Sequence, residues 1–214
     1  MITQTKRLTV PAPMTCDTFC RGVEKPTQLF ILLHGYMQSG KHIARQLEDA
    51  LPSDAEVLAI NGPFPIPRKS EEGLKLGYSW YFYNPKTDEL VIDMKTSIEF
   101  IKGAIAALGF ESLPKTLVGY SQGGYLAPFV ARELSHVSRL IALNAEVLDD
   151  ELEGQLGFRV DSIHGAKDEI VDPKKSRERH ARLKARGVQG EFVELPESGH
   201  QITEEMMSAL RGLF

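Results

Sequence analysis

The sequence predicts a single α/β domain, in which helices cover both faces of a mostly parallel central sheet. Short apolar runs alternate along the chain with longer segments of helical periodicity, which is the pattern of βαβ crossovers. Of the 214 residues 42% are hydrophobic and 25% are charged, ordinary values for a globular protein with one sizeable core. Because no repeat or linker divides the chain, residues 1–214 are expected to form one α/β domain.

The first half of the chain contains two strands and two helices of this pattern. Residues 29–33 are a continuous apolar run, typical of a strand buried on both faces. A helix over 41–51 carries its apolar residues on one side, and 57–60 reads as the next strand. Three alternating prolines then predict a loop over 63–67, before an aromatic cluster at 78–83. Apolar residues at helical spacing predict a helix over 92–108.

The second half repeats the alternation. Strands are expected at 115–120, 139–143, 158–163 and 191–195. Helices are expected at 122–134, 174–186 and 202–214, the last with an apolar residue at every fourth position. The helix over 174–186 is rich in basic residues, so it is expected to present a solvated face that includes His180.

Several function classes are excluded by composition. The net charge of −4 provides no global positive field for nucleic acid or an anionic membrane. Cys16 and Cys20 are too few for a disulfide framework, and the six histidines show no metal-ligand spacing, so neither a metal nor a cofactor is expected. Residues 1–13 lack the apolar run of a signal peptide, and no stretch is long enough to span a membrane. A cytoplasmic protein is therefore expected.

A nucleophilic serine is predicted at position 121. Gly119-Tyr-Ser-Gln-Gly123 fits the G-x-S-x-G pattern between an expected strand and an expected helix. A serine on that sharp turn sits in strained backbone, and small neighbours are needed because the strand and the helix pass close together. The turn presents the hydroxyl at the carboxyl edge of the sheet. The alternative interpretation is an ordinary glycine turn.

His200 is the predicted general base. A serine hydroxyl needs a histidine to accept its proton, and in this architecture the partners follow in the order serine, acid, histidine. His180 and His200 are the two candidates. His180 falls on the expected solvated helix, whereas His200 lies in a loop between the last strand and the last helix, where a general base belongs.

Asp168 is the predicted acid of the triad. It follows the end of strand 158–163 within one turn, so its carboxylate should point to the same edge as the serine and fix the tautomer of the histidine. Glu169 and Asp172 compete by proximity, but Asp172 precedes Pro173 and more naturally caps the next helix. His164 is expected to shape the end of the strand rather than to react.

Two backbone amides are expected to bind a developing oxyanion. One belongs to Gln122, the residue after the nucleophile, and the other to Tyr36, in the loop after the strand that ends in His34-Gly35. The alternative interpretation of the second loop is a plain strand-to-helix turn.

These motifs together resemble the phospholipase/carboxylesterase family of α/β-hydrolases, which includes acyl-protein thioesterases and small carboxylesterases. The resemblance rests on Leu32-Leu-His-Gly-Tyr36, Gly119-Tyr-Ser-Gln-Gly-Gly124, His164-Gly-x-x-Asp168-x-x-Val171 and Gly199-His200, and it covers nearly the whole chain. It implies a triad of Ser121, Asp168 and His200, with oxyanion donors at Tyr36 and Gln122. A homodimer is also what the family suggests.

The sequence departs from the family at two places near the expected acyl site. Met37-Gln38 stand where the family usually has Gly-Asp, and Ser79-Trp-Tyr-Phe-Tyr83 lacks the acid of the family's aromatic stretch. Met37 and Trp80 are therefore the expected substrate-binding residues. No insertion after Tyr120 is long enough for a lid domain, which favours an open, shallow pocket.

The leading hypothesis is a serine carboxylesterase that acts on short-to-medium acyl chains through an acyl-enzyme. A small-molecule ester or thioester is the expected partner, with no nucleic acid and no integral membrane segment. The alternatives are an acyl-protein thioesterase or lysophospholipase with the same triad, and a non-catalytic α/β-hydrolase used as a binding module. The intact set of serine, acid, histidine and oxyanion loop argues against the binding module. A serine peptidase is disfavoured because no extra domain gates the site.

Overall fold

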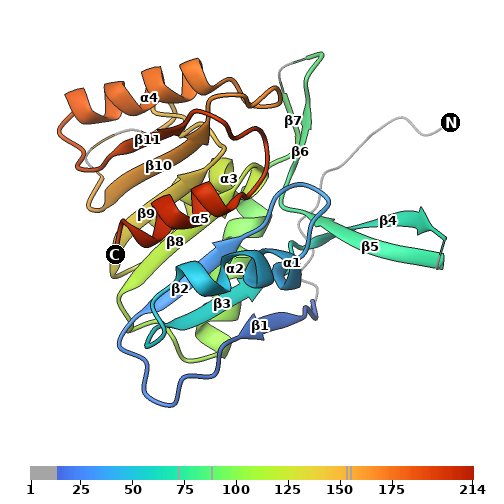
Figure 1. Cartoon of the computed structure of the whole chain (residues 1–214). Coiled ribbons are helices and arrows are strands. Elements are labelled where there is room, and N and C mark those ends of the chain that lie inside the picture. The colour runs from blue at the N-terminus through green and yellow to red at the C-terminus, as the bar shows by residue number, and fades with distance from the viewer. Residues whose placement is uncertain (1–13, 72, 88, 153, 155) are drawn as a thin grey trace, which may run out of the picture.

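A seven-stranded sheet forms the centre of the part of the chain described by the computed structural model, residues 14–71, 73–87, 89–152, 154 and 156–214 (Figure 1). Its strands, in spatial order, are β1 (Thr18–Cys20), β3 (Glu56–Ile60), β2 (Leu29–Leu33), β8 (Lys115–Tyr120), β9 (Val137–Leu143), β10 (Arg159–Gly165) and β11 (Phe192–Leu195). Every neighbouring pair is parallel except β1 and β3. The predicted fold class is confirmed. The expected absence of a signal peptide concerns residues 1–13, which lie outside the described residues.

Helices cover both faces of the sheet because the strands are buried on both sides. The apolar residues of β2 alternate between two clusters, with Leu29 and Ile31 in one and Phe30 and Leu32 in the other. The helices are α1 (Gly40–Leu47), α2 (Lys95–Ala107), α3 (Gln122–Glu133), α4 (Pro173–Ala185) and α5 (Glu204–Arg211). Buried residues of α2, α3 and α4 belong to the first cluster, and those of α1 and α5 to the second, so the two sets lie on opposite faces (Figure 1).

Chain order reverses at the centre of the sheet. From β2 the chain moves outward to β3, and it later returns on the other side of β2 as β8. In open parallel sheets such a switch point, at the carboxyl ends of the strands, is where ligands bind. The loops after β2 and β8, which contain Tyr36 and Ser121, both lie at this point.

Two antiparallel ribbons project beyond the central sheet, and neither was predicted (Figure 1). One pairs β4 (Phe64–Ser70) with β5 (Gly73–Ser79), and the other pairs β6 (Phe82–Asn84) with β7 (Glu89–Ile92). The prediction of a loop over 63–67 is therefore wrong. An antiparallel strand turns every second N–H away from its partner, so prolines at the alternate positions Pro65 and Pro67 can sit on an edge without removing a ladder bond.

The end of helix α1 and the start of helix α2 differ from the sequence prediction, because turns and side-chain caps determine where these helices end and begin. Helix α1 ends at Leu47, and a 3₁₀ turn over Glu48–Ala50 takes up the rest of the expected helix. Helix α2 begins at Lys95, whose N–H bonds to the Asp93 carboxylate at 3.0 Å, because Ile92 belongs to β7.

Helix α5 is also shorter than predicted. It begins after Thr203, whose hydroxyl accepts from the N–H of Met206 at 3.2 Å and so caps the first turn.

Helix α4 presents the expected solvated face, with Lys174, Arg177 and Lys184 exposed, but His180 does not lie on it. His180 is 3% exposed, with Nδ1 at 3.1 Å from the Ser162 hydroxyl and its ring against Phe192. Arg179 and Arg182 both contact the carboxylate of Asp149, at 3.2 and 2.7 Å. The basic helix is thus held to the segment after β9 by ion pairs, which lower the pKa of Asp149 in spite of its burial.

Candidate active site

The sharp turn between β8 and α3 holds Ser121 in strained backbone. Its φ of +50° and ψ of −119° are uncommon for a residue with a Cβ atom. Its N–H bonds to the carbonyl of Leu143 at 2.9 Å, which ties the turn to the neighbouring strand β9. A Cβ atom at Gly119 would come 2.4 Å from the carbonyl of Gly123, and one at Gly123 would come 2.1 Å from the carbonyl of Leu33. Glycine is therefore required at both positions, because a Cβ atom would collide with the backbone.

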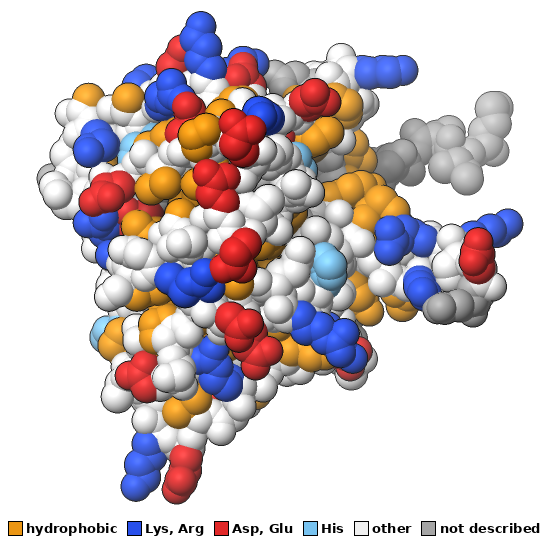
Figure 2. Space-filling view, in the orientation of Figure 1, with side chains coloured by type: hydrophobic (Ala, Val, Ile, Leu, Met, Phe, Trp, Pro, Cys, Tyr) orange, Lys and Arg blue, Asp and Glu red, His pale blue; other side chains and the backbone are white. Residues whose placement is uncertain are grey.

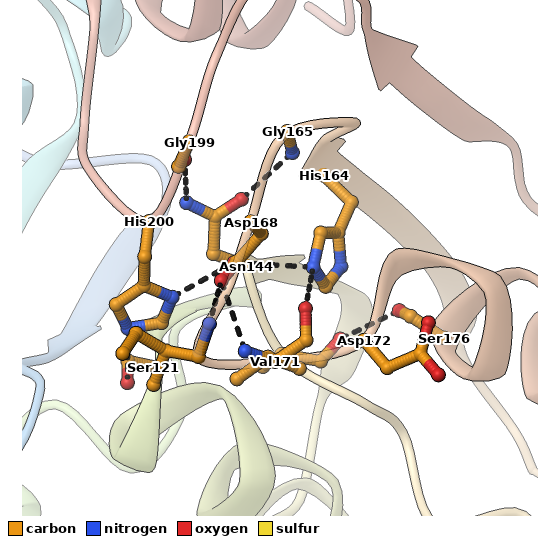
Figure 3. A network of polar contacts seen from close by, with 12 residues as sticks. Ser121, Asn144, His164, Gly165, Asp168, Val171, Asp172, Ser176, Gly199 and His200 are labelled. Atoms are coloured by element: carbon orange, nitrogen blue, oxygen red, sulfur yellow. Dashed lines mark hydrogen bonds and ion pairs between the residues drawn. The ribbon is translucent and has the colours of Figure 1, made fainter.

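Ser121, His200 and Asp168 form one continuous hydrogen-bonded chain (Figure 3). The Ser121 Oγ lies 2.9 Å from His200 Nε2, and His200 Nδ1 lies 2.8 Å from Asp168 Oδ2. Because a carboxylate only accepts, Nδ1 carries the imidazole hydrogen and Nε2 is free to accept the proton of the serine hydroxyl. The structure brings these three predicted residues together from loops that follow β8, β10 and β11.

The carboxylate of Asp168 is buried but well supplied with donors. Its side chain is 0% exposed. Its Oδ1 accepts from the backbone N–H groups of Ile170 and Val171, both at 2.9 Å, while Oδ2 faces His200. Backbone donors stabilise the ionised form of a buried carboxylate and also fix its plane. The Asp168 carboxylate is therefore held in one orientation.

Neither competing acid reaches the histidine. Asp172 is exposed and accepts from the N–H of Lys174 at 2.9 Å, so it is the N-cap of α4, as its position before Pro173 predicted. Glu169 is also exposed, whereas the side chain of Asp168 is buried and points inward.

Two residues that the sequence analysis missed hold the His200 loop in place. The Tyr120 hydroxyl donates to the carbonyl of His200 at 2.9 Å. The Asn144 side-chain amide donates to the carbonyl of Gly199 at 3.0 Å, and its oxygen accepts from the N–H of Gly165 at 2.9 Å (Figure 3). Asn144 therefore connects the ends of β9, β10 and β11. Asparagine tolerates the left-handed φ of +46° found there, and an asparagine directly after a buried strand was the available signal.

The two expected oxyanion donors lie on neighbouring, well-braced loops. The Gln122 N–H belongs to the first turn of α3, where no intrahelical acceptor is available. The Gln122 side chain is anchored by a bond to the carbonyl of Tyr81 at 2.8 Å. A Cβ atom at Gly35, next to Tyr36, would come 3.0 Å from the Tyr120 ring, which places this loop beside the nucleophile turn.

The loop after β2 is fastened to the β4–β5 ribbon. Met37 donates its N–H to the carbonyl of Tyr78 at 2.9 Å, and the Tyr78 N–H donates to the carbonyl of Gln38 at 2.8 Å. Gly77 lies so close that a Cβ atom there would come 2.3 Å from the carbonyl of Met37. Met37 itself has a φ of +60° and is half-buried, and its role in substrate binding stays a prediction.

Trp80 does not line an open pocket, which corrects the sequence-based expectation. It is 0% exposed, its Nε1–H donates to the carbonyl of His34 at 2.8 Å, and its ring lies 4.7 Å from the His34 ring. The indole therefore packs in the core and supports the strand end before Tyr36. The aromatic cluster is not one surface, since Tyr81 is buried and Tyr83 is exposed.

Three buried histidines should make the protein less stable in mild acid. Burial lowers the pKa of His34 to about 4, and it also lowers the pKa values of His164 and His180. The unfolded chain binds protons near pH 6.5, so between that pH and the folded pKa values the unfolded state holds more protons and stability falls as the pH falls. At pH 5 the loss from His34 alone should be about 2 kcal/mol.

Urea unfolding at pH 7.5 and at pH 5 measures this difference. The exposed His136 provides the control, since His136→Asn should leave the pH dependence unchanged. Equal stability at the two pH values would contradict the prediction.

The described residues contain no cluster of three or more histidine, cysteine or acidic residues that could hold a metal ion. Among the helices formed by these residues, none has the length and apolar character needed to cross a bilayer.

The comparisons with known proteins identify the family. A family model described as serine hydrolase (FSH1) matches residues 24–202. A search of curated proteins gives no match to the sequence.

The solved structures that share the fold include three esterases or thioesterases. A carboxylesterase from Mesorhizobium loti is 21% identical with a TM-score of 0.70, and the match covers 92% of this chain and 93% of that one. An esterase described as PE8 is also 21% identical, with a TM-score of 0.70 and coverage of 93% and 96%. Acyl-protein thioesterase 2 from Zea mays is 17% identical, with a TM-score of 0.68 and coverage of 92% and 97%. The resemblance inferred from the motifs is thereby confirmed.

Proposed function

We propose, from the premise that this chain belongs to the FSH1 family of serine hydrolases, that it hydrolyses carboxylic esters of short-to-medium acyl chains through Ser121, His200 and Asp168. One observation carries the proposal. The hydroxyl, the imidazole and the carboxylate are linked by bonds of 2.9 and 2.8 Å, in the tautomer that leaves Nε2 free to accept a proton.

The reaction follows from this geometry. His200 takes the proton of Ser121 as its Oγ attacks the carbonyl carbon, and Asp168 stabilises the imidazolium that forms. The amides of Tyr36 and Gln122 bind the oxyanion of the tetrahedral intermediate. His200 then gives its proton to the departing alcohol, which leaves an acyl group on Ser121. A water molecule, deprotonated by His200, releases the acid and restores the serine. Side chains and backbone amides supply every step.

The acyl-chain dependence of kcat/KM tests the substrate class. With no lid insertion and a site bounded by the braced Met37 loop, a shallow pocket is expected. Each methylene that becomes buried adds about 0.8 kcal/mol of binding, so activity should rise over short chains and then level off or fall. Nitrophenyl esters from acetyl to palmitoyl give the measurement. A steady increase up to palmitoyl would refute the shallow pocket.

A second candidate is an acyl-protein thioesterase or lysophospholipase, favoured by the outer face of the β4–β5 ribbon. Opposite residues in this pairing share a face, which places Pro67 with Leu76 and Lys69 with Leu74. Leu74 is 70% exposed and Leu76 is 51% exposed. Hydrophobic side chains gather at the base of the ribbon, and basic side chains lie farther out (Figure 2). An apolar projection of this kind suits a lipid or an acylated protein.

Matched oxygen esters and thioesters of the same acyl chain separate the two candidates. A preference for the thioester, together with a weaker thioester rate in Leu74→Ser, would favour the second. A preference for the oxygen ester, unchanged in Leu74→Ser, would favour the first. A protein that turns over neither class and takes no fluorophosphonate label would be a binding module.

A further inference from the structure

Asp168 contacts a second imidazole besides that of His200 (Figure 3). His164 Nε2 lies 3.2 Å from Asp168 Oδ2, the same oxygen that His200 Nδ1 contacts at 2.8 Å. It also lies 3.1 Å from the carbonyl oxygen of Val171. The side chains of His164 and Asp168 are both 0% exposed. Two imidazole nitrogens therefore meet at one buried carboxylate oxygen.

The contacts of His164 determine its tautomer. Both neighbours of Nε2 are acceptors, so Nε2 must carry the hydrogen and donate to them. The other nitrogen, Nδ1, is buried and has no hydrogen-bond partner among the described residues. Burial lowers the pKa of His164, which keeps the ring neutral. An unsatisfied buried nitrogen requires an explanation, and the bond from Nε2–H to Asp168 provides one.

We propose that His164 is a positioning residue for the hydrolytic reaction, whose Nε2–H completes the set of donors that fixes the Asp168 carboxylate against His200. The inference rests on the proposed function. The N–H groups of Ile170 and Val171 occupy Oδ1, and the two histidines share Oδ2.

The shared oxygen has a consequence for the base. A donor on Oδ2 withdraws part of the carboxylate charge from His200. Without that donor, the full carboxylate charge would act on His200 and would stabilise its protonated imidazolium form. Because the unprotonated ring is the form that activates Ser121, the acid limb of the pH profile would then move to higher pH.

The other titratable groups near His164, Asp168 and His200 come from β8, from α4 and from the loops after β10 and β11. Tyr120 on β8 bonds to the His200 carbonyl, and burial raises its pKa to about 12, so it stays neutral in this range. His180 on α4 contacts the ring of Phe192, with 5.6 Å between the ring centroids, and the same ring stacks on His164. The exposed ion pair of Lys167 and Glu197 joins the loops that carry Asp168 and His200. These groups are the same in the variants described next, except where His180 is the control.

The test compares His164→Phe, which keeps a ring but removes the donor, with His164→Gln, which retains an N–H donor. His180→Phe is the matched control, because His180 is 3% exposed, also has one unpartnered ring nitrogen (Nε2, where His164 has Nδ1) and packs against the same Phe192 ring. His164→Phe should lower kcat by about 10- to 100-fold with KM nearly unchanged, as expected for a misplaced catalytic group. His164→Gln should recover most of the rate, and His180→Phe should keep it.

Nitrogen-15 NMR of the histidines measures the pKa of His200 and the tautomer of His164 in the absence of substrate. The pKa of His200 should rise by about 0.5 to 1 unit in His164→Phe and stay unchanged in His180→Phe. No rise, a fall, or an equal rise in both variants would overturn the proposal. In the wild-type protein His164 should be the Nε2–H tautomer, and an Nδ1–H tautomer would overturn it even if His164→Phe does not fold.

Failure of the proposed function has a separate signature. A wild-type protein that hydrolyses no ester or thioester, yet shows the predicted His164 tautomer and the shift of the His200 pKa, would refute the hydrolase assignment. The contact between His164 and Asp168 would then be confirmed, but it would have no role in hydrolysis.

Discussion

Replacement of Ser121 by alanine should lower kcat/KM by several orders of magnitude, as removal of a triad member does in other serine hydrolases. Alanine removes the Oγ that lies 2.9 Å from His200 but adds no bulk at the crowded turn. The protein should therefore remain folded, because the bond from the Ser121 N–H to the Leu143 carbonyl is made by the backbone. Hydrolysis of a short nitrophenyl ester, with a thermal unfolding curve beside it, measures both effects.

A fluorophosphonate probe with peptide mapping gives the same answer chemically. Ser121 should be the labelled serine in the wild-type protein, and the Ser121→Ala variant should take no label. Ser39 is a suitable control, since its hydroxyl caps α1 through the N–H of His42 at 3.2 Å. Ser39→Ala should cost about 1 kcal/mol of stability and little activity. Label on Ser39, Ser79 or Ser198 instead would assign the nucleophile elsewhere.

Replacement of Asp168 by asparagine should lower kcat/KM by roughly 10³- to 10⁴-fold with the fold retained. The N–H groups of Ile170 and Val171 donate to Oδ1 at 2.9 Å, so the amide oxygen of the asparagine must take that position. Its NH₂ group then occupies the place of Oδ2 and donates to His200 Nδ1. This moves the imidazole hydrogen to Nε2, which can no longer accept the proton of Ser121.

Asp172→Asn is the control for this variant. Asp172 accepts from the N–H of Lys174 at 2.9 Å and makes no contact with the triad. The variant should lose less than about 1 kcal/mol of stability, because asparagine also caps helices well, and it should keep its activity. Reversed kinetics in the two variants would transfer the acid role to Asp172.

The sequence was a good guide where one feature depends on local spacing. The apolar run of β2 and the glycines around Ser121 were recognisable because strand burial and steric crowding each demand particular residue types. The order of serine, acid and histidine then pointed to the loops after β8, β10 and β11. The structure brings those side chains within hydrogen-bond distance.

The errors came from features that depend on distant partners. The buried side of helix α4 consists of Ser176, His180 and Leu183. Only the leucine is apolar, so hydrophobic periodicity did not indicate which side of the helix is buried. The prolines of β4 looked like loop residues because the edge that tolerates them exists only in the paired ribbon. Trp80 was read as a pocket residue, since a sequence does not show which aromatic ring of a cluster turns inward.

The arrangement of the site also has a kinetic consequence. Ser121 and His200 are 79 positions apart in the chain, and Asp168 and His200 are 32 apart. Contacts between such distant positions form slowly, because loop closure costs entropy before the contact repays it. The triad closes only after β10 and β11 have joined the sheet in register, with His164 opposite Glu194. During refolding, the recovery of activity should therefore lag behind the recovery of helix content. The catalytic rate would then report when the last strands join the sheet.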